Sequence, residues 1–266
     1  MSRPPLRRAG ARARAAVMLA AGLIAAAGLA FVAEREAFVA ERKAFVAERQ
    51  AAPTPVAPSA KPELMLLTSL PLVFGEKFGL EGGGSPALKA LETRYTVVPV
   101  AVADAGSLGQ RRLLLIAHPL AQPAEALVDL DRWVRGGGRL LLLADPALEW
   151  HSERPLGDPL RPPPAFADTG LLGHWGLRLD APDERGPRQS TLGGQAILTA
   201  SPGTLFGTCR ISGDRLVAHC RIGKGEATIV ADADFLNVEQ LGGPTANNLN
   251  AMLAELAALE GRVGNR

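Results

Sequence analysis

Polar residues stand at the ends of several apolar runs in this sequence. Thr68-Ser69, His118 and Asp145 each follow a run rich in leucine or alanine, and Asp232 and Asp234 follow another such run. In an open α/β sheet, ligands bind in the crevice outside the carboxyl ends of the strands. The sequence therefore predicts that these six residues line a crevice for a ligand or a protein partner.

Ser69, His118 and Asp145 have the residue types of a hydrolytic triad. The sequence has no Gly-x-Ser-x-Gly elbow, however, and Ser69 is followed by Leu70-Pro71 rather than by the start of a helix. A polar residue before proline is also an ordinary end for a strand. We therefore assign no catalytic residue. A hydrolase acting in this crevice, through these three side chains or through a metal, is kept as the alternative function.

Asp232 and Asp234 are spaced so that they could hold a divalent cation. Two carboxylates alone make a poor site, because such ions take six or more oxygen ligands, and Asp145 or Glu76 would have to lie nearby. The other histidines show no ligand spacing. We predict no metal and no cofactor.

Cys209 and Cys220 are the two cysteines of the chain. They flank a predicted hairpin over 204–219 that turns at Ser212-Gly213-Asp214, so they are expected to face each other. In an oxidising compartment they would form a disulfide, which by loop-closure entropy is worth roughly 3 kcal/mol.

The elements that position these residues alternate between apolar strands and helices. The predicted strands are 64–69, 95–102, 112–117, 140–144 and 227–231, and the predicted helices are 85–93, 123–134 and 246–260. The strands at 112–117 and 140–144 are apolar throughout, which is typical of a parallel sheet covered on both faces. We predict an open, doubly wound, mostly parallel α/β sheet with a C-terminal β-hairpin.

Residues 148–168 interrupt this alternation with many prolines and charges. We expect an irregular loop there. A long structureless segment in a compact domain is either functional or disordered.

The charges of the chain are unevenly placed. Its 29 basic and 27 acidic residues give a net charge of +2, but the five arginines of residues 1–14 have no acidic neighbour. Residues 62–266 hold 19 basic and 23 acidic residues, a net −4. The folded part is therefore mildly acidic, and we expect no nucleic-acid partner.

Residues 15–33 form an uninterrupted apolar run of 19 residues. As a helix it would reach about 28 Å, the thickness of a hydrocarbon core. The arginines before it predict that the N-terminus is cytoplasmic and the rest periplasmic. A cleaved signal peptide ending near Gly28-Leu29-Ala30 is the alternative. The length of the run favours an uncleaved anchor in the inner (cytoplasmic) membrane.

A seven-residue repeat, Ala-Phe-Val-Ala-Glu-Arg followed by a variable residue, occurs three times over 30–50. Seven is the period of a coiled coil, so the repeat could pair two chains, but no register places large apolar residues at both core positions. We favour a helical spacer. The predicted order of segments is a basic tail (1–14), an anchor (15–33), a stalk (34–50), a Pro-rich linker (51–62), an α/β domain (63–260) and a tail (261–266).

Three stretches of the domain resemble a known family. They are Leu113–Pro119, Trp133–Pro146, and Gly223–Phe235 with the helix that contains Asn247-Asn248. Together they resemble the GldG-like domain of auxiliary components of ABC-type transport systems. The resemblance implies a fold similar to class I glutamine amidotransferases. The nucleophilic cysteine of those enzymes is absent, because the matching position reads Asp145-Pro146, so the resemblance does not imply their activity.

The resemblance and the segment order together predict the function. We expect a non-catalytic, membrane-anchored periplasmic domain that binds a protein partner or a small ligand, as an accessory of an ABC-type transporter or an envelope complex. The chain has no Walker A motif and one predicted span, so it is expected to be neither the ATPase nor the permease.

Overall fold

The structure, a computed structural model, describes residues 61–75 and 84–261. The chain divides into two units, 1–59 and 60–266, and every described residue belongs to the second. The predicted basic tail, anchor and stalk lie outside the described residues, as do most of the linker and Glu76. Among the residues that are described, no helix is long and apolar enough to cross a membrane.

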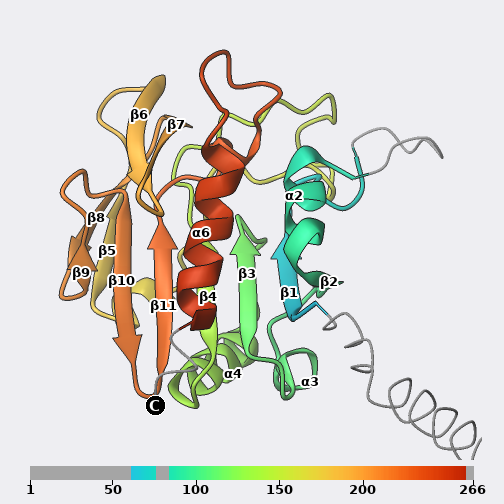
Figure 1. Ribbon diagram of the computed structural model, residues 1–266, viewed down its shortest axis with the longest axis vertical. Helices are drawn as coiled ribbons and strands as arrows, with labels where there is room; N and C mark the ends of the chain where they lie inside the picture. Colours follow the sequence, from blue (N-terminus) through green and yellow to red (C-terminus); the bar gives the residue numbers. More distant parts are fainter. Residues whose placement is uncertain (1–60, 76–83, 262–266) are drawn as a thin grey trace, which may run out of the picture. The chain divides into compact units, whose positions relative to one another are not determined.

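A mostly parallel sheet forms the centre of the described unit (Figure 1). Its seven strands lie in the order β2-β1-β3-β4-β11-β10-β9. Five of them are parallel: β1 (Glu63–Thr68), β2 (Thr96–Pro99), β3 (Leu113–Ala117), β4 (Arg139–Leu143) and β11 (Gly225–Val230). The antiparallel strands β10 (Val217–Ile222) and β9 (Arg210–Ile211) complete one edge. The prediction of a mixed α/β fold with a mostly parallel sheet is confirmed.

The apolar runs of the sequence became the centre of this sheet. Every residue of β3, β4 and β11 is buried, so both faces of these strands are covered. The predicted strand over 95–102 is shorter, because β2 is an edge strand that ends at Pro99. Proline has no N–H to continue the ladder, which suits an edge.

Helices cover the sheet and connect its parallel strands. They are α2 (Pro86–Arg94), α3 (Ala105–Leu108), α4 (Ala124–Arg135), α5 (Leu171–His174), the 3₁₀ turn η1 (Asp234–Leu236) and α6 (Asn248–Gly261). Helix α2 begins as the sequence predicts: Ser85 is the N-cap, its hydroxyl accepts the N–H of Leu88, and Pro86 opens the first turn. Helix α6 contacts α2, β3 and β4, and it crosses in front of the sheet in Figure 1.

Two small antiparallel sheets flank the central one. Strands β6 (Pro187–Leu192) and β7 (Gln195–Ala200) form a hairpin that is not among the predicted elements. Gly193 and Gly194 connect them with φ values of +56° and +74°. A two-residue turn that requires positive φ at both positions favours this glycine pair, which was the available signal.

The predicted hairpin over 204–219 is only partly correct. Residues 210–211 do pair with 218–219, across the turn at Ser212-Gly213-Asp214. Strand β8 (Thr204–Gly207), however, pairs with β5 (Leu177–Asp180) in a separate sheet. The hairpin therefore begins only at β9, and the longer antiparallel partner of β10 is β11.

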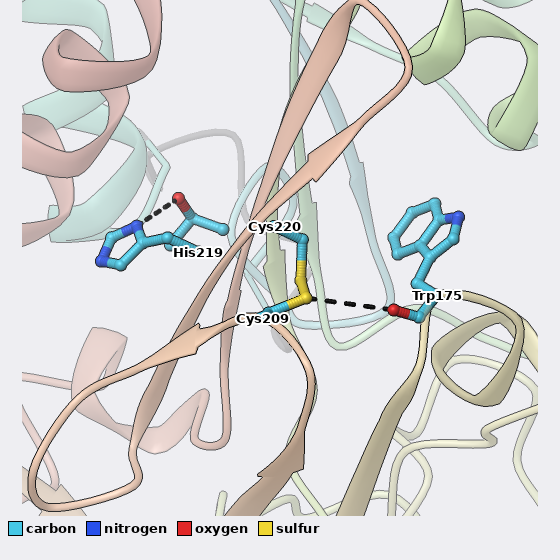
Figure 2. The surroundings of a disulfide bond; sticks show 5 residues. Trp175, Cys209, His219 and Cys220 are labelled. Atoms are coloured by element: carbon cyan, nitrogen blue, oxygen red, sulfur yellow. Dashed lines mark hydrogen bonds between the residues drawn. A yellow bond between two sulfur atoms is a disulfide. The ribbon is translucent and has the colours of Figure 1, made fainter.

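The predicted disulfide between Cys209 and Cys220 is present (Figure 2). Their Cα atoms are 4.9 Å apart. Cys209 lies just before β9 and Cys220 lies in β10, so the bond ties the short edge strand to its neighbour. The Cys209 sulfur also lies 3.9 Å from the carbonyl oxygen of Trp175, near the small β5–β8 sheet.

Candidate functional site

The six residues predicted to line a crevice all lie where strands of the central sheet end. Thr68 and Ser69 end β1, His118 follows β3, and Asp145 follows β4. Asp232 and Asp234 follow β11. This is the upper edge of the parallel strands in Figure 1. The structure separates the six into two groups: Thr68 and Ser69 line an open crevice, whereas His118 and the three aspartates are buried.

Asp145, Asp232 and Asp234 form a buried cluster. One carboxylate oxygen of each lies within 4.8 Å of the others. The sequence required either Asp145 or Glu76 beside the other two, and the structure brings Asp145 there. Strands β4 and β11 are adjacent and parallel, so the residues after them must meet.

Main-chain N–H groups surround these carboxylates. The Asp145 oxygens accept the N–H of Ala147 and of Ala233, both at 2.8 Å. Those of Asp232 accept from Phe235 at 2.9 Å and from Ala200 at 3.2 Å.

Asp234 differs from the other two. One of its oxygens accepts the N–H of Glu149 at 2.7 Å, and its carboxyl group is also hydrogen-bonded to that of Asp145. Five of the six cluster oxygens therefore accept main-chain donors.

Burial raises the pKa of every carboxyl group in the cluster, because the charged form loses its hydration. The pKa of Asp145 rises from its ordinary 3.8 to about 6, and that of Asp234 to about 8. The pKa of Asp232 also lies well above its ordinary value, through burial and then through repulsion by the other two aspartates. The cluster therefore holds protons that it must release as the pH rises.

Three carboxylates at this spacing also have the geometry of a divalent-cation site. Here their oxygens are largely occupied by main-chain donors, and a carboxyl–carboxyl hydrogen bond joins two of them. We therefore interpret the cluster as a hydrogen-bonded hub between segments of the chain and assign no cation ligand within it.

His118 is a second buried titratable group at this edge. Its φ is +45°, which is uncommon for a residue with a side chain. Its Nε2 lies 2.8 Å from the carbonyl oxygen of Pro163 and therefore donates to it. Its Nδ1 has no hydrogen-bond partner among the described residues. Burial lowers the pKa of His118, because the charged imidazole would be poorly solvated.

Ser69, His118 and Asp145 do not form the hydrogen bonds of a triad. The Ser69 hydroxyl donates to the carbonyl oxygen of His118 rather than to its ring. The His118 ring faces Pro163, and the Asp145 carboxylate faces the N–H groups of Ala147 and Ala233. These polar groups instead complete the hydrogen bonding where the strands end.

The 148–168 loop contains no helix or strand, as predicted, and it contacts both His118 and the aspartate cluster. Near its start, the N–H of Leu148 donates to Pro164 at 3.0 Å. Near its end, the N–H of Phe166 donates to the carbonyl oxygen of Asp145 at 2.6 Å. Glu149 also accepts the hydroxyl of Ser201, a residue after β7. These long-range bonds explain why His118 and the aspartates do not face the crevice.

The open crevice has a volume of about 370 Å³ and lies outside the carboxyl ends of β1 and β2. The strand order reverses between β1 and β3, next to this crevice, and Leu120 after β3 is part of the crevice lining. Ligands bind at such points in open α/β sheets. The sequence identified Thr68 and Ser69 here.

Apolar residues from three loops form most of the crevice. Phe74 follows β1, Leu120 follows β3, and Leu160 belongs to the 148–168 loop. These side chains are 73%, 50% and 57% exposed. The sequence gives no signal for this grouping, because only the path of the loops brings these side chains together. Arg154 is a cation in the lining, and it pairs with Asp158 at 3.6 Å.

Comparison with known proteins gives no family. No protein-family model matches the chain, and no curated protein matches it. The exo-β-1,4-mannosidase Op5Man5 from Opitutaceae bacterium strain TAV5 aligns with 75% of this chain at 13% identity and a TM-score of 0.46. The chain spans 36% of that enzyme.

Two shorter proteins align over nearly their whole length. The cytoplasmic protein STM1381 from Salmonella typhimurium LT2 matches 74% of this chain and 99% of its own, at 12% identity and a TM-score of 0.48. The mmIFT52 N-terminal domain matches 73% of this chain and 96% of its own, at 12% identity and a TM-score of 0.46. At this similarity none of these proteins informs the function of the chain.

Proposed function

We propose that the chain is a non-catalytic binding domain, anchored in the cytoplasmic membrane, that receives a protein partner in the crevice beside β1 and β2. The observation that carries this proposal is the apolar lining of the crevice, with Phe74, Leu120 and Leu160 exposed. Exposed apolar side chains that gather at one place mark interaction sites.

A protein suits this crevice better than a small molecule does. Pockets for small ligands bury most of the ligand surface. Here the side chains of Phe74, Leu120 and Leu160 are half or more exposed, so they reach outward and are themselves available for burial. Aromatic and aliphatic anchors on both partners are typical of the centre of a protein–protein interface. We expect the partner to present an apolar helix face or loop.

We also propose that the domain catalyses no reaction through Ser69, His118 and Asp145. The side chains of Ser69, His118 and Asp145 are each hydrogen-bonded to main-chain groups. No observation favours the hydrolase alternative, and we do not propose it.

The proposed membrane anchor and periplasmic location of the domain are supported by the sequence. The apolar run over 15–33 and the arginines before it favour an anchor with a cytoplasmic N-terminus and a periplasmic domain. The Cys209–Cys220 disulfide is consistent with an oxidising compartment. A reporter enzyme that is active only outside the cytoplasm, fused after residue 60, tests this. An inactive fusion would contradict the periplasmic location.

The resemblance to GldG-like domains supports a finer proposal. It suggests a fold related to class I glutamine amidotransferases and a partner within an ABC-type transport or envelope complex. The repeat over 30–50 would then hold the domain away from the membrane or pair two copies of the chain.

Charged substitutions in the crevice test the proposed function. Leu160→Asp and Phe74→Asp place a charge in the apolar lining. Val128→Asp is the matched control, since Val128 is 56% exposed but lies outside the crevice. Each full-length variant is crosslinked in membranes, and the attached proteins are quantified. We expect one partner to be lost at least about tenfold from both crevice variants and kept by the control. Equal recovery from all three folded variants would contradict the proposal.

A further inference from the structure

A second cavity, about 410 Å³ in volume, is lined by the β6–β7 turn, the β9–β10 turn, strand β10 and helix α6. It shares no lining residue with the crevice. We propose that this cavity binds a primary ammonium group, on a small organic amine or on a lysine side chain, through the buried carboxylate of Glu255. The proposal does not depend on the proposed function of the crevice.

Glu255 lies in α6 and is held beside the cavity by the β6–β7 turn. It is 7% exposed, and its Oε1 accepts the N–H of Gly193 at 3.1 Å. A Cβ atom added at Gly193 would overlap the carbonyl oxygen of Ala251, so the turn packs directly on the helix. This packing fixes the carboxylate of Glu255, which forms part of the cavity lining.

The other oxygen of Glu255, Oε2, accepts no hydrogen bond from the residues that the structure describes. His219 Nδ1 lies 4.0 Å from it, beyond hydrogen-bond distance, and would form an ion pair only when protonated. That nitrogen is closer to the hydroxyl of Thr228, at 3.2 Å. Figure 2 shows His219 on the opposite side of β10 from Cys220. A carboxylate as buried as Glu255 is normally paired. The cavity therefore offers a charged acceptor to a ligand.

The charges of the cavity lining favour a positive ligand. The lining contains two carboxylates, Glu255 and Asp214, and neither lysine nor arginine. The Asp214 oxygens accept the hydroxyl of Ser212 at 2.6 Å and the N–H groups of Thr191 at 3.1 Å and Leu216 at 3.2 Å. Asp214 thus joins the two turns and shapes the cavity, while its charge adds to the negative potential.

An ammonium group fits this arrangement better than a metal ion does. Among the described residues, three ligand atoms of histidine, cysteine or carboxylate come within 4.8 Å of one another only in the aspartate cluster. A metal ion in this cavity would therefore have too few protein ligands.

An ammonium group also fits better than a guanidinium. A guanidinium is held best by both oxygens of a carboxylate, and one oxygen of Glu255 already accepts the Gly193 N–H. An ammonium group needs only one carboxylate oxygen. Its remaining N–H groups can donate to hydroxyl oxygens of the lining, which Thr191 and Ser212 supply.

Isothermal titration calorimetry of the full-length chain in detergent, at neutral pH and low salt, tests the proposal. The probes are 1,4-diaminobutane for a free amine and N-acetyl-lysine amide for a lysine side chain. 1,4-Butanediol, which has the same length without the charge, is the control ligand. We expect saturable binding of at least one ammonium probe and none of the diol. Tighter binding of the diamine would indicate a small amine as the ligand, and tighter binding of the lysine probe a partner's lysine.

Glu255→Gln is the principal variant. Glutamine can still accept the Gly193 N–H, but its NH₂ group replaces the charged acceptor. We expect the dissociation constant for the ammonium probe to rise at least about tenfold, as when a hydrogen bond to a charged group is lost. Glu184→Gln is the matched control, because it removes the same charge from an exposed residue outside the cavity. It should bind as the native chain does.

A pair of variants at Gly213 provides a second test if Glu255→Gln fails to fold. Gly213 lines the cavity, a Cβ atom there meets open space, and its φ is not positive. We expect Gly213→Lys, which adds a competing positive charge, to bind the probe at least about threefold more weakly than Gly213→Gln.

Three results would overturn the proposal. The first is a folded native chain that binds neither ammonium probe saturably. The second is equal affinity in the folded Glu255→Gln and Glu184→Gln variants. The third is equal affinity in the two folded Gly213 variants.

Discussion

The oxygens of the three buried aspartates have different partners, and this difference decides which substitution each position tolerates. Both oxygens of Asp145 and both of Asp232 accept main-chain N–H groups. Asp234 accepts one, and its carboxyl group also bonds to Asp145. The end of an asparagine side chain carries one acceptor and one donor. Asparagine therefore suits position 234 and conflicts with the two main-chain donors at positions 145 and 232.

We therefore expect Asp145→Asn and Asp232→Asn to destabilise the protein by about 1–3 kcal/mol each, because an amide NH₂ would face a buried main-chain N–H. Asp234→Asn should cost less than either. Urea unfolding of the three full-length variants at neutral pH measures this order. Equal losses at all three positions would show that the hydrogen-bond assignment is incorrect.

The same residues make the stability depend on pH. Their pKa values are raised in the folded state, so the folded protein binds more protons than the unfolded chain does. The stabilisation is complete below about pH 4 and is lost as the pH rises through about 6 for Asp145 and about 8 for Asp234. We expect the free energy of unfolding to fall between about pH 5 and about pH 9, and to fall less in Asp234→Asn. Parallel curves for the two chains would contradict this.

At the scale of elements, β11 begins in close contact with the end of α4. A Cβ atom added at Gly225 would overlap the carbonyl oxygens of Val134 and Gly138. We expect Gly225→Ala to destabilise the fold by about 1–3 kcal/mol, as overpacking does. Gly213→Ala is the control, since a Cβ there meets open space and its φ is not positive. Thermal unfolding compares the two, and an equal effect would argue against the tight α4–β11 junction.

The disulfide acts on the edge of the same sheet. It joins residues 11 apart, and the loop-closure estimate for such a ring is about 3 kcal/mol. We expect the Cys209→Ser/Cys220→Ser variant to unfold at a lower temperature than the native chain, and reduction of the native chain to reproduce the loss. If the double variant is as stable as the oxidised protein, the disulfide does not stabilise the pairing of β9 with the sheet.

Much of this architecture could be predicted from the order of residues. Ser85-Pro86 marks the start of α2, and the unbroken apolar runs of β3 and β4 indicate a sheet covered on both sides. The β6–β7 hairpin was missed although Gly193-Gly194 was available as a signal. The extent of the hairpin near 204–219 could not be predicted, because the pairing of β8 with β5 connects segments more than twenty residues apart.

The candidate site was predictable in part for the same reason. Parallel strands end at one edge, so the meeting of Asp145 with Asp232 and Asp234 follows from strand order. Whether those residues face water depends on the path of the 148–168 loop. Bonds such as Phe166 N–H to Asp145 determine that path, and no local pattern encodes them.

At the scale of the whole molecule, the sequence separates a basic N-terminus from an acidic domain. Residues 1–14 carry five arginines, and residues 62–266 carry a net charge of −4. We propose that the first part sets orientation in the membrane and that the second binds through apolar contacts. We propose that this binding is the docking of a protein in the crevice beside β1 and β2.

Site-specific photocrosslinking in intact cells tests that claim most directly. A photoreactive amino acid is placed at Phe74, at Leu160, or at the control position Val128, each exposed in the folded domain. We predict that the two crevice positions crosslink to the same protein and that Val128 does not. Crosslinks to that protein from Val128 alone, or none from either crevice position in a folded, membrane-inserted chain, would contradict the claim.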